Sequence, residues 1–472
     1  MEQEQHNALV ALLKQRERRS AKDSRKYGKS LRKAVPRDVF SVWQPPVGRP
    51  DSSELIFGQD ETRVPGLVPV RHERMSASAF TFYRGAALVM ASDLAHVPTT
   101  GIEVQLCGDA HVSNFGLFLS PERRTVFDIN DFDETARGPW EWDVARLVTS
   151  LEICGRNRGF SRKTCSKVAL ASAWGYREAM RRFAEMGNLD VWYAHADVDT
   201  LMQAFGNRLS KEGRRRAKKV VGKSKAKNSS RAISKLTEVV DGRLQVVSDP
   251  PVVVPLRNIV AQAGVKVPAD LDMAKVVASV LAQYRRTLSP ERKALIDRYR
   301  GVDIAHKVVG VGSVGLQAWI VVLEGTGPDD PLVLQVKEAT SSVLERFVGK
   351  APYRNHGERV VEGQRAMQTA SDMLLGWTSL MLPDGTRDFY VRQLWDGKGS
   401  INLDVIEPDA LEQLAKACGW TLAHAHARTG DRHAIAAYLG KSDVFDQSMA
   451  EFARAYADQN ERDYARFLDA LV

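Results

Sequence analysis

Two short stretches of the chain gather side chains that bind metal ions and transfer protons. The first, Cys107–Gly116, is a predicted loop that contains Asp109, His111 and Asn114. The second follows shortly afterwards and sets acidic residues between apolar ones: Asp128, Asp131, Asp133 and Glu134. Without partners, these carboxylates would repel one another and lose hydration, so we expect a divalent cation among them. Mg²⁺ prefers one or two carboxylates together with waters and substrate phosphates.

A second constellation, about two hundred residues further on, is suited to binding phosphate. Residues 310–315 read Gly-Val-Gly-Ser-Val-Gly, and a strand is predicted directly after them, at Leu316–Leu323. A dinucleotide-binding fold would need a helix there, whereas a strand–loop–strand hairpin can cover ATP phosphates with its backbone. The β-rich run that follows ends at a lysine, which can position phosphates. The predicted phosphate-binding residues are Gly310, Gly312, Ser313, Gly315 and Lys337.

Further nucleotide contacts are predicted from the next helix and strand. Glu362 lies in a helix predicted over 358–373 and is expected to pair with Lys337; two other acids are alternatives, Glu345 and Glu358. Residues 388–394 are predicted as a strand that leads into an adenine-binding hinge. Gln393 and Leu394, at the end of this strand, are therefore expected to contact the nucleotide.

The spacing Asp-x-x-x-x-Asn from Asp109 to Asn114 is that of the catalytic loop in kinase-type phosphotransferases. The longer pattern Gly-Asp-x-His-x-x-Asn resembles the loop of aminoglycoside and choline kinases. The Asp-Phe-Asp sequence at 131–133 resembles their metal-binding Asp-Phe-Gly motif. The resemblance implies that Asp109 orients or deprotonates an acceptor hydroxyl, and that Asn114 and Asp131 hold Mg²⁺. It also implies that His111 contacts substrate or supports the loop.

Some details depart from that pattern or leave it open. Cys107 stands where those kinases usually have His or Arg, whereas Asp143 resembles an acid that commonly follows in the same enzymes. The distance along the chain to Asp143 favours Asp131 as the metal ligand. The separation from Asn114 favours Asp128 instead, so both acids remain candidates.

The order of the two constellations is reversed relative to an ordinary kinase, in which the glycine loop comes first. We therefore expect a circular permutation, which is physically possible because domain termini often lie close together at the surface. The predicted fold class is α+β: a two-lobed protein-kinase-like fold, circularly permuted, with a helix-rich C-lobe and a small antiparallel-sheet N-lobe. The predicted divisions are 1–75 as a basic helical extension, 76–205 as the catalytic-loop half of the C-lobe, 206–300 as a basic linker with a helical insertion, 301–400 as the nucleotide-binding lobe and 401–472 as helices that complete the C-lobe.

Over most of its length the chain also resembles a bacterial family known as domain of unknown function 2252. The resemblance rests on five segments: Phe82–Ala86, Cys107–Gly116, Phe127–Glu134, Gly138–Asp143 and Val360–Arg365. Membership implies a place in the protein-kinase-like superfamily. It implies no particular substrate.

Positive charge is concentrated in one segment. The formal net charge is +9, and Lys211–Lys235 contains eleven Lys or Arg and a single acid, Glu212. Such a run can bind nucleic acid, or it can be a solvated connector. No aromatic residue interrupts it, so it offers no platform for stacking bases.

The composition is that of an ordinary globular protein, with 44% hydrophobic and 26% charged residues among 472. The longest apolar stretch, Val308–Leu323, is interrupted by glycines and is shorter than the ~20 residues of a membrane-spanning helix. The four cysteines form no Cys-x-x-Cys pair, which indicates neither a disulfide scaffold nor a zinc ribbon. The N-terminus has no signal-peptide pattern, so we expect a cytoplasmic protein without a membrane partner.

The leading hypothesis is a phosphotransferase that uses ATP and Mg²⁺ on a hydroxyl of a small-molecule acceptor. Nucleotidyl transfer could use the same residues. One alternative is a metal-dependent hydrolase with four residues around two metals: Asp109, His111, Asp128 and Asp131. Another is a non-catalytic protein that binds a nucleotide, or binds nucleic acid through Lys211–Lys235.

Overall fold

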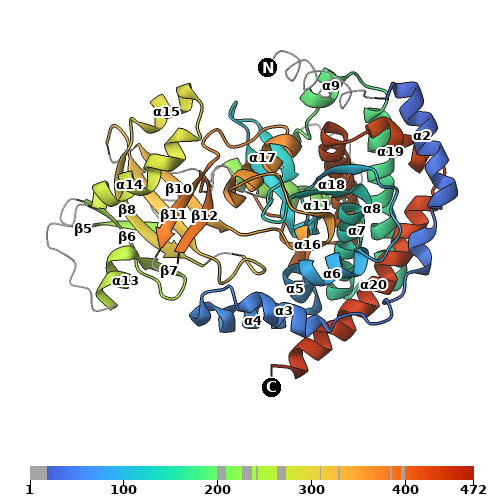
Figure 1. Ribbon diagram of the computed structural model, residues 1–472, viewed down its shortest axis with the longest axis horizontal. Coiled ribbons are helices and arrows are strands. Elements are labelled where there is room, and N and C mark those ends of the chain that lie inside the picture. The colour runs from blue at the N-terminus through green and yellow to red at the C-terminus, as the bar shows by residue number, and fades with distance from the viewer. Residues whose placement is uncertain are drawn as a thin grey trace, which may run out of the picture.

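The computed structural model describes most of the chain, namely residues 19–198, 209–225, 236–240, 243–262, 273–308, 310–327, 330–382, 385–394 and 399–471. These residues form a sheet-containing part and a larger helical part that lie side by side (Figure 1). The predicted α+β class is therefore confirmed. None of the helices in this described portion is long and apolar enough to cross a membrane.

The sheet has six antiparallel strands in the order β11–β12–β10–β9–β8–β7 (Figure 1). The strands are β7 (Val253–Pro255), β8 (Arg300–Lys307), β9 (Ala318–Glu324), β10 (Pro331–Ala339), β11 (Gly376–Leu382) and β12 (Gly385–Gln393). Side chains alternate between the two faces of a strand. In β10, Leu334 packs with Tyr284 of helix α14 (Met273–Arg286), whereas Val333 packs with Val246 on the other face. Apolar cover on both faces explains the nearly continuous apolar sequence of this strand.

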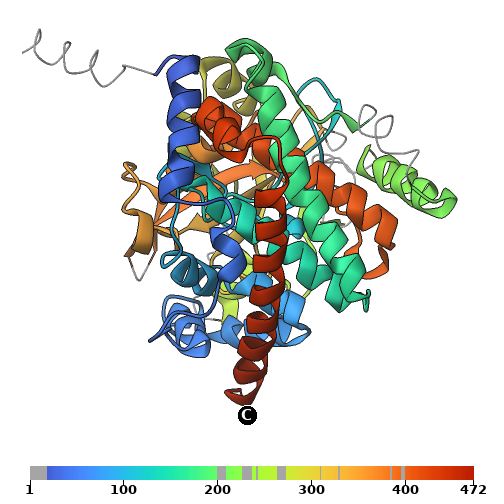
Figure 2. The same cartoon turned by 90° about the vertical axis from the view of Figure 1, so that its right-hand side faces the viewer.

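The helical part is built from segments of both the N-terminal and the C-terminal regions of the chain. Its main helices are α2 (Ala21–Ala34), α7 (Trp140–Asn157), α8 (Arg162–Phe183), α18 (Pro408–Thr429), α19 (Arg432–Leu439) and α20 (Val444–Asp469). Figure 2 shows α2, α8 and α20 on this side of the molecule. Near the N-terminus, Arg32 Nε donates to the carbonyl oxygen of Tyr438 at 2.9 Å, which ties α2 to α19.

Two short antiparallel strand pairs hold the loops that lie between the sheet-containing part and the helical part. Strand β1 (Glu103–Leu106) pairs with β4 (Ala136–Pro139), and β2 (Phe115–Leu119) pairs with β3 (Thr125–Ile129). Residues Ser120–Arg123 form the turn between β2 and β3, closed by a hydrogen bond from the amide of Arg123 to the carbonyl oxygen of Ser120 at 2.8 Å. Residues 107–114 connect β1 to β2, and residues 130–135 connect β3 to β4, so both acidic loops emerge from the same pair of small sheets.

Two predicted elements were wrong in part, and a further helical stretch is interrupted. The interruption lies at Ala86, whose backbone angles of −109° and 36° separate α5 (Ala79–Gly85) from α6 (Ala87–Leu94). The helix predicted over 358–373 is α17 (His356–Met367), which ends because Gln368 adopts an extended conformation. The insertion predicted to be helical also contains strands: β5 (Thr237–Val240), β6 (Arg243–Val246) and β7.

Close contact between α8 and α18 requires glycine. A Cβ atom added to Gly419 would lie 2.2 Å from the carbonyl oxygen of Ser172, so Gly419→Ala must push the two helices apart. We expect this variant to lose about 1–3 kcal/mol of unfolding free energy. Gly222→Ala in α11 (Lys211–Lys225) is the control, because nothing lies within 4 Å of its added Cβ. Chemical denaturation of both variants tests this; equal stabilities would contradict the close packing.

Candidate functional site

A cavity of about 250 Å³ lies where the two parts of the molecule meet. Residues of the first constellation line one side: Asp109, His111, Asn114, Asp131, Asp133 and Glu134. Residues of the glycine-rich segment line another: Gly310, Val311, Gly312 and Ser313. The fold therefore brings together two groups of residues that lie about two hundred positions apart in the sequence.

One face of α7 holds the loop that carries Asp109. The carboxylate of Asp143 accepts hydrogen bonds from the amides of Cys107 and Gly108 at 2.8 and 3.0 Å. One turn later, Arg146 pairs with Asp109 through Nε at 2.9 Å and Nη2 at 2.8 Å. After another turn, Ser150 accepts from the amide of Val112 at 2.9 Å. Residues three and four apart share a helix face, so one rigid element fixes the whole loop.

The side chain of Asn114 donates to the carbonyl oxygen of Asp109 at 2.8 Å, which leaves its Oδ1 as the atom suited to a cation. His111 lies next to Asp109, with 3.6 Å between Nε2 and Oδ2. Burial lowers the pKa of His111 to about 4, although the charge of Asp109 opposes this shift. His111 is therefore neutral near pH 7, and it can accept or donate a hydrogen bond but adds no charge to the cavity.

Lys337 lies behind the cavity wall and is 3% exposed. Its ammonium forms a close ion pair with Asp133 and lies 4.0 Å from Asp131. Tyr390 donates to the second oxygen of Asp133 at 2.9 Å. Burial alone would lower the pKa of Lys337, but the charges of Asp131 and Asp133 outweigh it and raise the pKa. Burial and the nearby Asp131 raise the pKa of Asp133, whereas Lys337 lowers it.

The predicted pairing of Lys337 with Glu362 is wrong. The carboxylate of Glu362 instead pairs with Arg365, at 2.8 Å and within α17. The alternative Glu345 pairs with Arg359 at 3.4 Å. The physical reason is that Arg359 is the residue of α17 that points toward the buried acidic loop, where it donates to main-chain carbonyls.

The glycine-rich segment connects β8 to β9 and adopts a conformation that requires glycine at two points. Gly310 and Gly315 have φ angles of 77° and 94°, in the left-handed region. Two arginines of the N-terminal region hold its carbonyls: Arg74 of α4 (Val68–Ser76) donates to Gly310 O at 2.5 Å, and Arg63, in the turn after α3, donates to Val314 O. Gly315 does not line the cavity; its carbonyl accepts from the amide of Val64 at 2.8 Å.

Asp128, Gln393 and Leu394 lie away from the cavity. Asp128 is buried beneath it, where its carboxylate accepts from the amides of Ile129 and Thr369 at 2.8 and 3.3 Å. The amide of Gln393 donates to Asp372, and Leu394 packs in the core beside the sheet. Of the two candidate metal ligands, the structure places Asp131 in the cavity and Asp128 outside it.

The cavity suits a cation that takes part of its coordination from a ligand. Within the part of the chain that the structure describes, no three His, Cys, Asp or Glu side chains lie close enough to hold an ion by themselves. Mg²⁺ needs only one or two carboxylates when phosphates and waters complete its shell. The carboxylate of Asp131, 34% exposed, and the amide oxygen of Asn114 fit that requirement.

Sequence reasoning missed four residues near the cavity: Arg63, Arg84, Arg146 and Arg346. Arg146 had a detectable signal, since it follows Asp143 by three residues, the spacing of side chains that share one face of a helix. Arg63 and Arg84 had none, because they reach the cavity only through the packing of N-terminal helices α3 (Ser52–Asp60) and α5.

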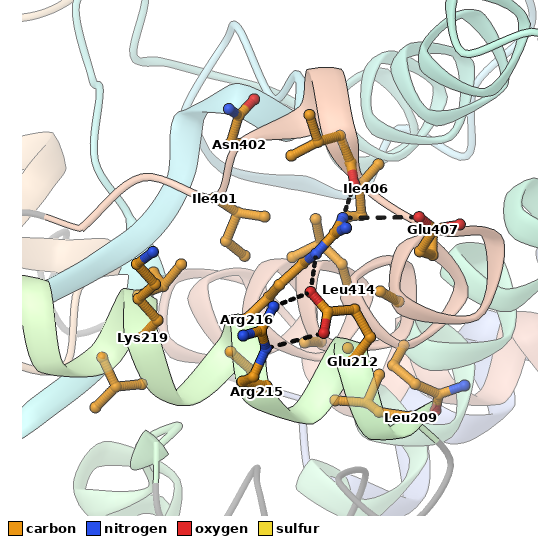
Figure 3. Close-up of a pocket in the computed structure, with 18 of the residues that line it drawn as sticks. Leu209, Glu212, Arg215, Arg216, Lys219, Ile401, Asn402, Ile406, Glu407 and Leu414 are labelled. Atoms are coloured by element: carbon orange, nitrogen blue, oxygen red, sulfur yellow. Dashed lines mark hydrogen bonds and ion pairs between the residues drawn. The ribbon is translucent and has the colours of Figure 1, made fainter.

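A larger cavity of about 510 Å³ lies elsewhere, between α11, β2 and α18, and contains none of the predicted site residues (Figure 3). Its interior is apolar. At its rim, Arg216 pairs with Glu212 at 3.0 Å and approaches Glu407 at 3.6 Å, so other residues of the chain neutralise part of the charge of α11. The rest of the basic run, residues 226–235, lies outside the described residues.

These features define an α+β protein in which a six-stranded antiparallel sheet and a helical body share one charged cavity. Residues 63–470 match the family model described as DUF2252, an uncharacterized protein conserved in bacteria, and the chain belongs to that family. The match covers every residue of the predicted site. No curated protein and no solved structure matches the chain.

The buried Asp128 provides a pH-dependent test of this geometry. Burial raises its pKa to about 7 from 3.8, although two amide hydrogen bonds lower it. Between these two pH values the Asp128 carboxyl is ionised in the unfolded chain and protonated in the folded protein. The free energy of unfolding therefore falls as pH rises through this range, by at most about 1.4 kcal/mol per pH unit. Asp128→Asn should therefore gain stability relative to wild type between pH 4 and 7. Urea denaturation at pH 5 and pH 7.5 measures the difference; a constant difference would contradict the assignment.

Proposed function

We propose that the protein is a Mg²⁺- and ATP-dependent phosphotransferase with a circularly permuted, two-lobed kinase-like architecture. The observation that carries the proposal is the shared cavity. Asp109, Asn114 and Asp131 line it together with Gly310 and Gly312, although the two groups lie far apart in the sequence. Each group alone is a weak signal, and their meeting at one cavity is the arrangement that phosphoryl transfer requires.

The order of the sheet elements supports the same function. The glycine-rich segment joins β8 to β9, Lys337 lies on the next strand, and α17 follows that strand. In protein kinases the phosphate-contacting lysine is likewise on the third strand, after the glycine loop, and a helix with its partner follows. Here the partner is Asp133 of the acidic loop, so we assign Lys337 a positioning role: it fixes Asp133 at the cavity wall.

The residues around the cavity can then be given roles in the reaction. The ion pair with Arg146 orients the carboxylate of Asp109, as needed to align an acceptor hydroxyl. Asp131 and Asn114 would hold Mg²⁺, which neutralises phosphate charge when it is bound. Backbone groups of Gly310–Ser313 would cover the phosphates. Catalysis would come mainly from positioning and from charge stabilisation.

The size of the cavity favours a small acceptor. Gln59 of α3, Arg63 just after that helix and Arg84 of α5 are among the residues that line this cavity of about 250 Å³. A protein segment would need a longer open groove. The hydrolase alternative would need Asp128 beside Asp109 and His111, and Asp128 does not reach the cavity.

Thermal unfolding with and without Mg-ATP tests the proposal. A ligand at 100 times its dissociation constant adds about 2.7 kcal/mol of stability. Wild type should gain this stability, and Asp131→Asn should lose most of the gain because it removes the proposed metal ligand. Asp128→Asn is the matched control, since it makes the same change outside the cavity and should keep the gain.

Two results would contradict the proposal. If Mg-ATP at millimolar concentration does not stabilise wild type, the nucleotide site is wrong. If Asp128→Asn loses the gain and Asp131→Asn keeps it, the metal assignment is wrong and the hydrolase-type arrangement is favoured.

A further inference from the structure

Arg84 lies at the point where the two constellations approach each other. It is the last but one residue of α5 and lines the cavity. Its main-chain oxygen would be 3.2 Å from a Cβ atom added to Gly312, so the residue lies directly against the glycine-rich segment. The charges that act most strongly on its guanidinium are those of Asp109 and Asp131. Arg84 is therefore close to Asp109, to Asp131 and to the glycine-rich segment.

The guanidinium of Arg84 lacks a partner among the described residues. It makes no hydrogen bond or ion pair with them, and its Nε is buried with nothing to accept its proton. Burial lowers the pKa of Arg84. Other arginines at the site differ: Arg63 donates to a carbonyl, and Arg146 pairs with Asp109. A partly buried cation without a partner is costly unless a bound anion completes it.

We propose that Arg84 is a catalytic residue that contacts the phosphoryl group during its transfer, a role that rests on the function proposed above. The transferred group is the one part of the reactants that must lie near Asp109, Asp131 and Gly312 at once. Its three equatorial oxygens share the negative charge of the transition state. The planar guanidinium of arginine can bind two such oxygens through a fixed pair of N–H groups, whereas a lysine ammonium acts as a point charge. Lys337 pairs with Asp133 and does not line the cavity, whereas Arg84 lines it and can supply positive charge there.

Binding of Mg-ADP with aluminium fluoride tests this role without knowledge of the acceptor. Aluminium fluoride occupies the place of the transferred phosphoryl group, whereas Mg-ADP alone leaves that place to water. Isothermal titration should show that wild type binds the aluminium fluoride complex more tightly than Mg-ADP. Arg84→Gln should lose roughly tenfold or more of that extra affinity and keep its affinity for Mg-ADP. Arg346→Gln is the matched control, because this arginine lines the same cavity but is exposed; it should change the extra affinity less than about twofold.

Each outcome either supports or overturns the role proposed for Arg84. If Arg84→Gln keeps the extra affinity, or loses Mg-ADP affinity to the same degree, the role is wrong although the nucleotide site stands. If wild type does not bind Mg-ADP at all, the proposed function fails and this inference fails with it. A structural role for Arg84 would lower the melting temperature of ligand-free Arg84→Gln, and also that of Arg84→Lys. We expect both ligand-free variants to melt within a few degrees of wild type, because neither loses a partner.

Discussion

The buried ion pair between Lys337 and Asp133 joins the sheet to the acidic loop of the helical body, across 204 positions of the sequence. The side chain of Lys337 is 3% exposed and that of Asp133 is 21% exposed, and removal of one partner of a buried pair costs about 3–5 kcal/mol. Arg359 reinforces the junction by donating to the carbonyl oxygens of Asp133 and Thr135 at 2.8 and 2.5 Å. The relative placement of the two constellations, and hence the cavity, depends on this junction. Substitution of Lys337 would therefore test folding and ligand binding together, whereas Asp131 and Arg84 lie at the cavity surface and separate the two.

The cavity lining carries charges of both signs, which suits a metal–phosphate ligand. Asp131 and Asp133 come from the acidic loop and Arg63 and Arg84 from the N-terminal region, and all four line the cavity. A cation would bind at the carboxylates and an anion at the guanidinium groups, and a metal–nucleotide complex brings both charges at once. The rigid support differs on the two sides: α7 braces the loop of Asp109, whereas N-terminal arginines hold the glycine-rich segment through its carbonyls.

Local signals in the sequence predicted much of this structure. Membership of the DUF2252 family is confirmed by the match over residues 63–470, and the α+β class is confirmed by the sheet and helices. Gly310 and Gly315 were informative because a left-handed φ angle favours glycine, so the residue type itself indicates the backbone conformation. The partner of Lys337 could not be predicted, because spacing along α17 does not tell which side chain will face the acidic loop. Arg84 was missed because its place depends entirely on how α5 packs.

Amide hydrogen exchange of the full-length protein, with and without Mg-ATP, tests most directly whether the two constellations form one site. We expect the nucleotide to slow exchange in peptides covering both 107–116 and 310–316, with equal dependence on nucleotide concentration. Peptides of α11, beside the larger apolar cavity, should exchange unchanged. Protection of only one of the two segments, or protection centred on α11, would contradict a single shared site.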